Sequence, residues 1–292
     1  FYEDTKTYVS KRTSKDKVKK GKRTKKEKYN FELVPSRNGT IHADWLVIGA
    51  GFAGLSAAKR LTELCQSDSI IVLEAGRIGE GPAGRNSGFM IDLPHELAAD
   101  AYAGSADADR KQITLNRHAQ DFARSVAEEY DMPDEAVAST GRVNGAVNAR
   151  GQAHNDHYAG KLDHLGESYQ RLDATDMKAM TGSDFYRSGL FTPGAVMLQP
   201  ALYVRHLAAG LASRGGRPVQ IFESSPAVAF EAKTGGWEVR TPDAIIHAGT
   251  IFMAVNGHAE SFGFFKQRLM HVFTYASMTD TLNANQQARL GG

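Results

Sequence analysis

Residues 44–74, DWLVIGAGFAGLSAAKRLTELCQSDSIIVLE, form one continuous pattern that decides the fold. An apolar run at residues 45–48 predicts a short strand, and glycines in GxGxxG spacing follow it. A helix is expected to begin near Phe52, and a second apolar run, Ile70–Leu73, predicts another strand. This is the order of a βαβ unit that binds a dinucleotide.

Each residue of the glycine-rich turn has its own physical task. Gly49 permits a tight turn, Gly51 lets the backbone approach a pyrophosphate, and Gly54 lets the helix pack closely. At the start of the helix, Phe52 and Ala53 would direct free N–H groups and the positive end of the helix dipole toward the phosphates. A glycine turn in some other α/β unit is the alternative, and the complete context disfavours it.

An acidic residue and a glycine-rich loop follow the second strand. Glu74 stands twenty residues after Gly54, where a carboxylate can accept hydrogen bonds from ribose hydroxyls. Residues 75–90, AGRIGEGPAGRNSGFM, are too rich in glycine for a helix or a strand. They favour FAD over NAD, because such a loop can follow an extended dinucleotide to its redox ring; a flexible surface loop is the alternative. The residues of this loop expected to contact the cofactor are Ala75, Arg77, Gly84, Arg85, Asn86, Ser87 and Gly88.

Three segments carry a family resemblance. GAGFAGLSAA at 49–58, VLEAGRIGEG at 72–81 and GRNSGFM at 84–90 resemble the FAD-dependent amine and amino-acid oxidases of the D-amino-acid oxidase superfamily, with the γ-glutamylputrescine oxidase group closest in style. The chain has AGRNSG where that group has an SGRNGG-type signature. Pro82 and Ala83 therefore stand where Ala and Ser are common in the family, and one hydroxyl that could touch the cofactor is missing.

The resemblance continues downstream from residue 41. Residues 141–149, GRVNGAVNA, resemble the strand that opens the family's substrate domain, and residues 191–216 resemble the return into the FAD domain, with a helix opening at Pro200. The resemblance implies a backbone contact to adenine at Val228. It also implies that the strand and turn at 250–257 pass close to the flavin phosphates through Ala254, Asn256 and Gly257.

The implied fold is α/β, with a discontinuous Rossmann-like FAD-binding domain and an α+β substrate domain. We expect a basic, disordered extension at 1–40, the FAD-binding domain at 41–100 and 195–257, and the substrate domain at 101–194 and 258–292. Residues 270–279 are interpreted as a strand of the substrate domain. Because the family pattern continues with further strands and a last FAD segment, the substrate domain is expected to be incomplete and the chain to be a C-terminally truncated fragment.

The implied function is oxidation of a C–N bond of an amine or amino acid. The neutral amine gives a hydride to flavin N5, the imine is hydrolysed, and dioxygen or another acceptor reoxidises the flavin. No catalytic side chain is named, since the flavin does the chemistry; Phe89 and Met90 are the candidate substrate contacts. A flavin-binding fragment or remnant without turnover, and a flavin dehydrogenase of another substrate class, stay open as alternatives.

The charge distribution and the cysteine content indicate which other partners, and which cellular compartment, to expect. Residues 11–28 hold eleven Lys or Arg against two acids, although the net charge of the whole chain is only +2. A solvated extension is favoured there over binding of nucleic acid or an anionic surface, because no aromatic residues interleave with the charges. The single cysteine, Cys65, excludes an intrachain disulfide and suits a reducing cytoplasm. No metal is expected, since His154, Asp156 and His157 lack the spacing of metal ligands on a helix.

Overall fold

The computed structural model describes residues 39–94, 105–215, 219–270, 272, 275 and 279–290. The predicted extension, including the basic segment 11–28, lies outside these residues except for its last two positions. The predicted strand at 270–279 also lies mostly outside them. Within the described part, no helix combines the length and the apolar character needed to cross a bilayer.

The βαβ unit forms where the sequence predicts it. β1 spans Gly39–Ile48, α1 spans Phe52–Leu64 and β2 spans Ile70–Leu73. β1 begins six residues earlier than the apolar run, because residues 39–43 pair in parallel with a distant strand. Their polar side chains alternate toward solvent, so an apolar run could not reveal them.

β1 lies inside a six-stranded sheet with the order β10–β11–β12–β1–β2–β9. The strands that join it from the second half of the chain are β9 (Gln220–Phe222), β10 (Ala229–Lys233), β11 (Gly236–Arg240) and β12 (Ala244–Met253). β12, β1, β2 and β9 are parallel, while β10 and β11 form an antiparallel edge. Segments far apart in the sequence thus share one sheet, which confirms a discontinuous Rossmann-like fold.

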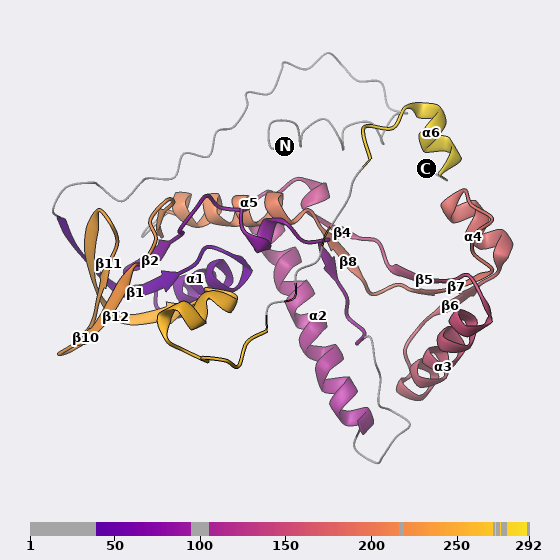
Figure 1. Cartoon of the computed structure of the whole chain (residues 1–292), viewed down its shortest axis with the longest axis horizontal. Coiled ribbons are helices and arrows are strands. Elements are labelled where there is room, and N and C mark those ends of the chain that lie inside the picture. The colour runs from indigo at the N-terminus through magenta and orange to yellow at the C-terminus, as the bar shows by residue number, and fades with distance from the viewer. Residues whose placement is uncertain are drawn as a thin grey trace.

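Two helices bury the apolar side chains on one face of this sheet. α5 spans Pro200–Ser213 and packs with α1 in the same core (Figure 1). Pro200 takes the first helical position, where an N–H group has no intrahelical partner. Leu207 and Leu211 are fully buried, and Leu202 is partly buried against the same core.

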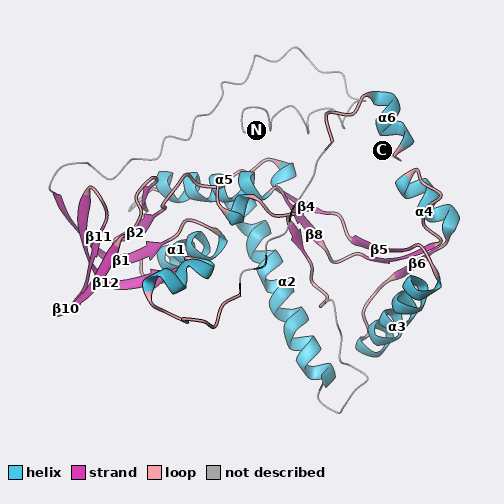
Figure 2. Ribbon diagram, in the orientation of Figure 1, coloured by secondary structure: helices cyan, strands magenta, loops and turns pink. Residues whose placement is uncertain are grey.

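The middle of the chain forms two smaller sheets. β3 (Phe89–Met90), β8 (Val196–Leu198) and β4 (Val137–Ser139) make one sheet, which lies near the long helix α2 (Ser105–Glu129). β5 (Arg142–Ala146), β7 (Ser188–Thr192) and β6 (Gln170–Leu172) make the other, with α3 (Ala149–Leu165) and α4 (Ala174–Thr181) beside it. Figure 2 shows this second sheet at the opposite end of the molecule from the six-stranded sheet. The remaining short elements are the 3₁₀ helices η1 (Pro82–Gly84), η2 (Asp134–Ala136) and η3 (Asn256–Phe262), and the helix α6 (Ala284–Arg289).

The glycine-rich loop at 75–90 contains regular structure, contrary to the prediction from its composition. η1 forms one short turn, and β3 pairs in antiparallel fashion with β8, Phe89 opposite Met197 and Met90 opposite Val196. The glycines are spaced widely enough to leave both short elements intact. The loop is therefore anchored at its far end by a sheet.

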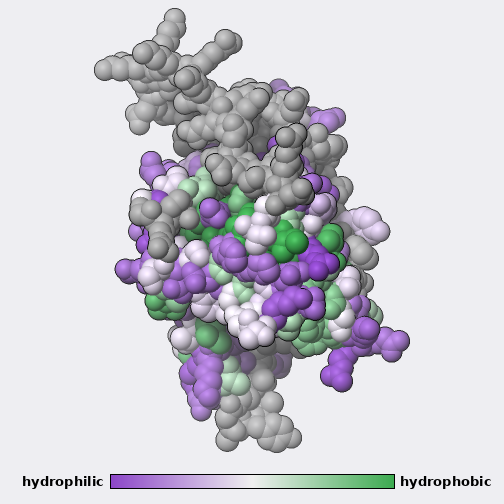
Figure 3. All heavy atoms as spheres, turned by 90° about the vertical axis from the view of Figure 1, so that its left-hand side faces the viewer, coloured by the Kyte–Doolittle hydropathy of each residue, from purple (hydrophilic) through white to green (hydrophobic). Residues whose placement is uncertain are grey.

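Apolar side chains gather among polar ones on the side of the molecule that carries β10, β11 and β12 (Figure 3). The rings of Phe262 and Phe264 lie 5.9 and 6.0 Å from that of Phe230 on β10, measured between centroids. The segment after β12 therefore packs against the six-stranded sheet. The exposed large apolar side chains of these strands and their connections include Val228, Ile245, Phe252, Phe264 and Phe265.

Candidate cofactor site

Three separated segments meet at one edge of the parallel sheet. Gly49 follows β1, Glu74 follows β2 and Ala254 follows β12, and these three strands run in the same direction. The chain passes from β1 to β2 on one side, whereas β12 pairs on the other side. The carboxyl ends of strands at such a switch point are where open α/β sheets bind their ligands.

The glycine turn combines tight packing with one open position. Gly49 has a φ of +105°, and a Cβ there would lie 2.5 Å from the carbonyl oxygen of Ala254. A Cβ on Gly54 would lie 1.8 Å from the carbonyl oxygen of Gly49. By contrast, a Cβ on Gly51 would approach only the Cβ of Ala83, at 3.4 Å. The protein's own packing therefore requires two of the glycines, while the third borders open space.

The N-terminus of α1 is suited to bind an anion. Its N-cap is Gly51, which has no side chain to accept a hydrogen bond, and its first turn contains no acidic residue. α3, α4 and α6 differ, because each begins with a capping Asn or Asp side chain. The N–H groups of Phe52 and Ala53, at the positive end of a 13-residue helix, therefore fit the pyrophosphate of a dinucleotide.

Glu74 is held in a fixed orientation beside this turn. Its Oε2 accepts a hydrogen bond from the backbone N–H of Ala50, and its Oε1 accepts one from Gly76, both at 3.0 Å. The backbone N–H of Glu74 donates to the carbonyl oxygen of Phe222 on β9, at 2.9 Å. Each carboxylate oxygen can accept a further hydrogen bond, so the arrangement fits two ribose hydroxyls.

The first half of the 75–90 loop is anchored by residues that sequence reasoning missed. The buried Ile78 donates its N–H to Oε1 of Glu223, at 2.6 Å, and accepts a hydrogen bond from Nε of Arg205, at 3.1 Å. Glu223 directly follows β9, and Arg205 lies on α5. No local motif marks either residue, because both contacts join segments more than a hundred positions apart.

The second half of the loop is shaped by Asn86. Its Nδ2 donates to the carbonyl oxygen of Ala83 at 2.9 Å, and its Oδ1 accepts from the N–H of Gly88, also at 2.9 Å. Gly88 has a φ of +79°, and a Cβ there would lie 2.1 Å from the carbonyl oxygen of Leu198. The side chain of Asn86 therefore holds the loop in position, and the neighbouring Arg85 side chain is exposed.

The other predicted contacts lie in several parts of the structure. Phe89 is half exposed, while Met90 packs against the main core. Val228 is exposed, and its N–H donates to the carbonyl oxygen of Arg240 at 2.8 Å. Ala254 pairs with the end of β1, whereas Asn256, with a φ of +50°, begins η3 and is followed by Gly257. Of the remaining loop residues, Ala75, Arg77 and Ser87 are exposed and Gly84 lies in η1.

One aromatic contact joins the start of α1 to α5. The rings of Phe52 and Tyr203 have centroids 6.0 Å apart, and Tyr203 is buried on α5. Burial raises the pKa of the Tyr203 hydroxyl above its usual value, so this residue stays neutral. The site contains no metal cluster: the described residues hold no group of three or more His, Cys, Asp or Glu side chains arranged for a metal ion.

A parallel sheet with a glycine turn, an uncapped helix after it and an acid at the end of the next strand is typical of dinucleotide-binding proteins. The sequence profile of the DAO family, described as FAD dependent oxidoreductase, matches residues 44–291, and the chain belongs to this family. The resemblance noted in residues 49–90 is thereby confirmed, and with it the dependence on FAD.

Three known proteins are similar to this chain. The chain is 33% identical over 224 residues to the probable oxidoreductase OrdL of Haemophilus influenzae, which covers 75% of this chain and 50% of that protein. It is 26% identical over 211 residues to gamma-glutamylputrescine oxidoreductase of Escherichia coli, and the match covers 67% of this chain and 47% of that protein. The chain thus spans about half the length of the curated relatives it matches. The crystal structure of glycine oxidase from Geobacillus kaustophilus shares the fold, with a TM-score of 0.63 at 15% identity, over 76% of this chain and 58% of that one.

Proposed function

We propose that this chain is an FAD-dependent oxidoreductase that oxidises a C–N bond of an amine or an amino acid. The observation that carries the proposal is the open glycine turn at an uncapped helix, with the Glu74 carboxylate fixed beside it. Two similar proteins, a gamma-glutamylputrescine oxidoreductase and a glycine oxidase, support the substrate class by their names. FAD, when bound, supplies the hydride acceptor at N5, and water hydrolyses the imine product.

The chain's own residues bind the cofactor and orient the substrate. In this proposal the turn at Gly49, Gly51 and Gly54 and the start of α1 hold the pyrophosphate, and Glu74 holds the ribose. Phe89 and Met90 would border the substrate, because they follow the loop that Asn86 holds in place. The further proposed cofactor contacts are Phe52, Ala53, Ala75, Arg77, Gly84, Arg85, Asn86, Ser87, Gly88, Val228, Ala254, Asn256 and Gly257.

We further propose that the FAD-binding domain comprises the six-stranded sheet with α1 and α5, and that residues 105–194 belong to the substrate domain. The ring contacts of Phe262 and Phe264 with Phe230 favour moving the second boundary from 257 to beyond 264. A cytoplasmic location is proposed on the single cysteine, Cys65, which is free.

The cofactor site can be tested at Gly51 with a matched pair of variants. Gly51→Ala adds a Cβ that meets only Ala83 at 3.4 Å, so the protein should fold and should lose less FAD affinity than a variant with a larger side chain. Gly51→Val adds two methyl groups on the ligand side of the turn, so it should fold but lose FAD binding. The measurement is a fluorescence titration with FAD, combined with circular dichroism. FAD affinity equal to that of the parent protein in both variants would remove this turn from the site.

The reaction can be tested separately by anaerobic mixing of the FAD-loaded protein with amines, amino acids and, as controls, 2-hydroxy acids. Loss of the flavin absorbance at about 450 nm reports reduction of the flavin, whatever the natural electron acceptor is. We expect reduction by at least one amine or amino acid and none by the hydroxy acids. Reduction by hydroxy acids alone would contradict the proposed substrate class and leave the cofactor site intact.

A further inference from the structure

Gln120, on α2, is a buried polar residue that holds two distant segments together. It is 3% exposed, and its Nε2 donates to the carbonyl oxygen of Met90 at 2.8 Å and to that of Gly194 at 2.9 Å. Met90 belongs to β3, and Gly194 lies in the turn between β7 and β8. Both donors of the amide are therefore used to fix the position of β3 against that turn.

Two further residues of α2 hold the next part of the same segment. Nδ2 of Asn116 donates to the carbonyl oxygen of Asp92 at 2.8 Å. Nη2 of Arg117 donates to Oδ2 of Asp92 at 2.9 Å, and this carboxylate is 2% exposed. Asn116 and Arg117 lie four and three positions before Gln120, so all three share one face of the helix. This face fixes the chain at residues 90–92.

Apolar packing holds α2 itself on both sides of these polar contacts. Ala123 and Val126 belong to the main core, against which Met90 also packs. Ile113 belongs to the smaller core formed with α3 and β7. Because these contacts keep α2 in place without the amide of Gln120, loss of that amide should release β3 rather than the helix.

β3 needs this support because it is short. It has two residues and lies at the edge of its three-stranded sheet, so only β8 pairs with it. The residue before it, Gly88, has a φ of +79°, and Phe89 is half exposed. A shift of the Met90 carbonyl group would therefore move both Gly88 and Phe89.

We infer that Gln120 is a positioning residue for the flavin and substrate side of the cofactor site. It acts through the carbonyl oxygen of Met90, and the contacts at Asp92 support it. The inference rests on the proposed function, which takes Gly88 as a cofactor contact and Phe89 as a substrate contact. A role in stability alone would leave the response of β3 to FAD unchanged when the amide is removed.

The test is hydrogen–deuterium exchange, measured by mass spectrometry with and without saturating FAD. Peptides that cover residues 49–54 report the glycine turn, and peptides that cover residues 88–93 report β3. FAD should slow exchange in both regions of the parent protein. Gln120→Leu removes both donors at a similar side-chain size, so FAD should still protect residues 49–54 but should no longer protect residues 88–93.

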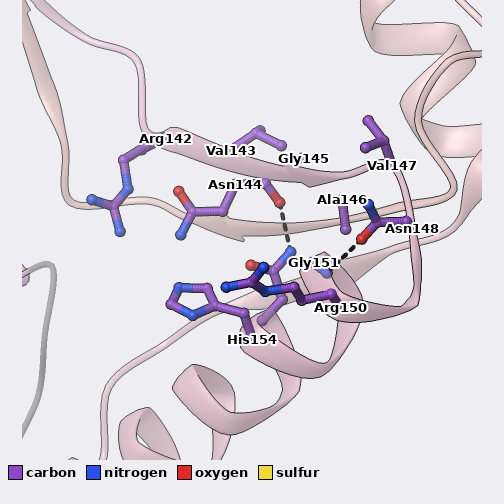
Figure 4. Close-up of a pocket in the computed structure, with 11 residues that line it drawn as sticks. Arg142, Val143, Asn144, Gly145, Ala146, Val147, Asn148, Arg150, Gly151 and His154 are labelled. Atoms are coloured by element: carbon purple, nitrogen blue, oxygen red, sulfur yellow. Dashed lines mark hydrogen bonds between the residues drawn. The ribbon is translucent and has the colours of Figure 1, made fainter.

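Asn155→Leu is the matched control. Asn155 is also buried, and its amide donates to the carbonyl oxygen of Asn144 at 2.8 Å, between α3 and β5 (Figure 4). Both variants leave buried carbonyl oxygens without a donor, so both should lower the unfolding temperature. Only Gln120→Leu should lose the FAD-dependent protection of residues 88–93.

The possible outcomes separate this inference from the proposed function. Absence of protection at residues 49–54 in the parent protein would contradict the cofactor site, and the inference with it. Protection there, but either none at residues 88–93 in the parent or an unchanged response of these residues in Gln120→Leu, would overturn the role of Gln120 alone. If Gln120→Leu does not fold, Gln120→Asn decides by the same comparison, because its shorter side chain cannot reach both carbonyl oxygens. Parent-like protection of residues 88–93 in that variant would overturn the inference.

Discussion

At Glu74 a single carboxylate connects the two halves of the proposed cofactor site. One oxygen binds the glycine turn at Ala50, and the other binds the following loop at Gly76. The spacing from Gly54 was enough to predict this residue, because the βαβ unit fixes the distance along the chain. Glu223 could not be predicted, since its contact with Ile78 spans 145 positions and depends on how β9 docks beside β2.

Removing this carboxylate should weaken FAD binding more than it weakens the fold. Glu74→Ala deletes acceptors whose charge-assisted hydrogen bonds contribute about 1.5 to 3 kcal/mol each at most, so FAD affinity should fall at least about tenfold. The measurement is a fluorescence titration with FAD. Glu80→Gln is the control, because Glu80 lies on the same loop and pairs only loosely with Arg77, at 3.6 Å. An equal loss in both variants would show that any change to the loop weakens binding and would contradict a specific role for Glu74.

Among the elements, those defined by local pattern were predicted best. β2 and the start of α1 lie where the apolar runs and glycines place them, and Pro200 begins α5. The start of β1 and the strand β3 were missed, because each depends on a partner strand distant in sequence. Local periodicity identifies an element that buries one face, but it does not identify a polar extension held only by backbone pairing.

Two helical glycines should respond in opposite ways to alanine. Gly54→Ala places a Cβ 1.8 Å from the carbonyl oxygen of Gly49, and such overpacking should cost about 1 to 3 kcal/mol or more. Gly160→Ala lies inside α3 with no atom within 4 Å of its new Cβ, so it should add about 0.5 to 1 kcal/mol of stability. Urea unfolding of both variants measures the difference. A neutral Gly54→Ala would contradict the close contact between α1 and the turn.

At the scale of the whole molecule, the distribution of exposed apolar side chains over the surface gives information that the buried core does not give. The end that carries β10, β11 and β12 leaves large apolar side chains exposed, among them Phe264 and Phe265 (Figure 3). Composition could not predict this, since the same residues would be core if another segment covered them. The resemblance of the sequence segments to a family predicted the discontinuous arrangement, because it concerns the order of the segments along the chain and not their surface contacts.

Two neighbouring phenylalanines on this surface, Phe264 and Phe265, should differ in how much they contribute to stability. Phe265 is exposed and has a φ of +54°, a conformation that Asn tolerates better than a bulky aromatic residue. Phe265→Asn should therefore keep or raise the unfolding temperature and reduce aggregation measured by light scattering. Phe264→Asn is the comparison and should lower the unfolding temperature, because the Phe264 ring stacks on Phe230. A destabilised Phe265→Asn would show that its ring has a packing role.

The position of β1 between β2 and β12 also sets an order of events during folding. The pairing of Ile48 with Leu73 forms within one local unit, whereas the pairing of Ile48 with Met253 must wait until residue 253, more than two hundred positions later, has been synthesised. Contacts of such sequence separation form slowly, and the open edge of β1 exposes unpaired backbone groups in the meantime. Ala254 reaches Gly49 only when β12 docks. Docking of β12, rather than formation of the glycine turn itself, is therefore expected to complete the proposed cofactor site in the nascent chain.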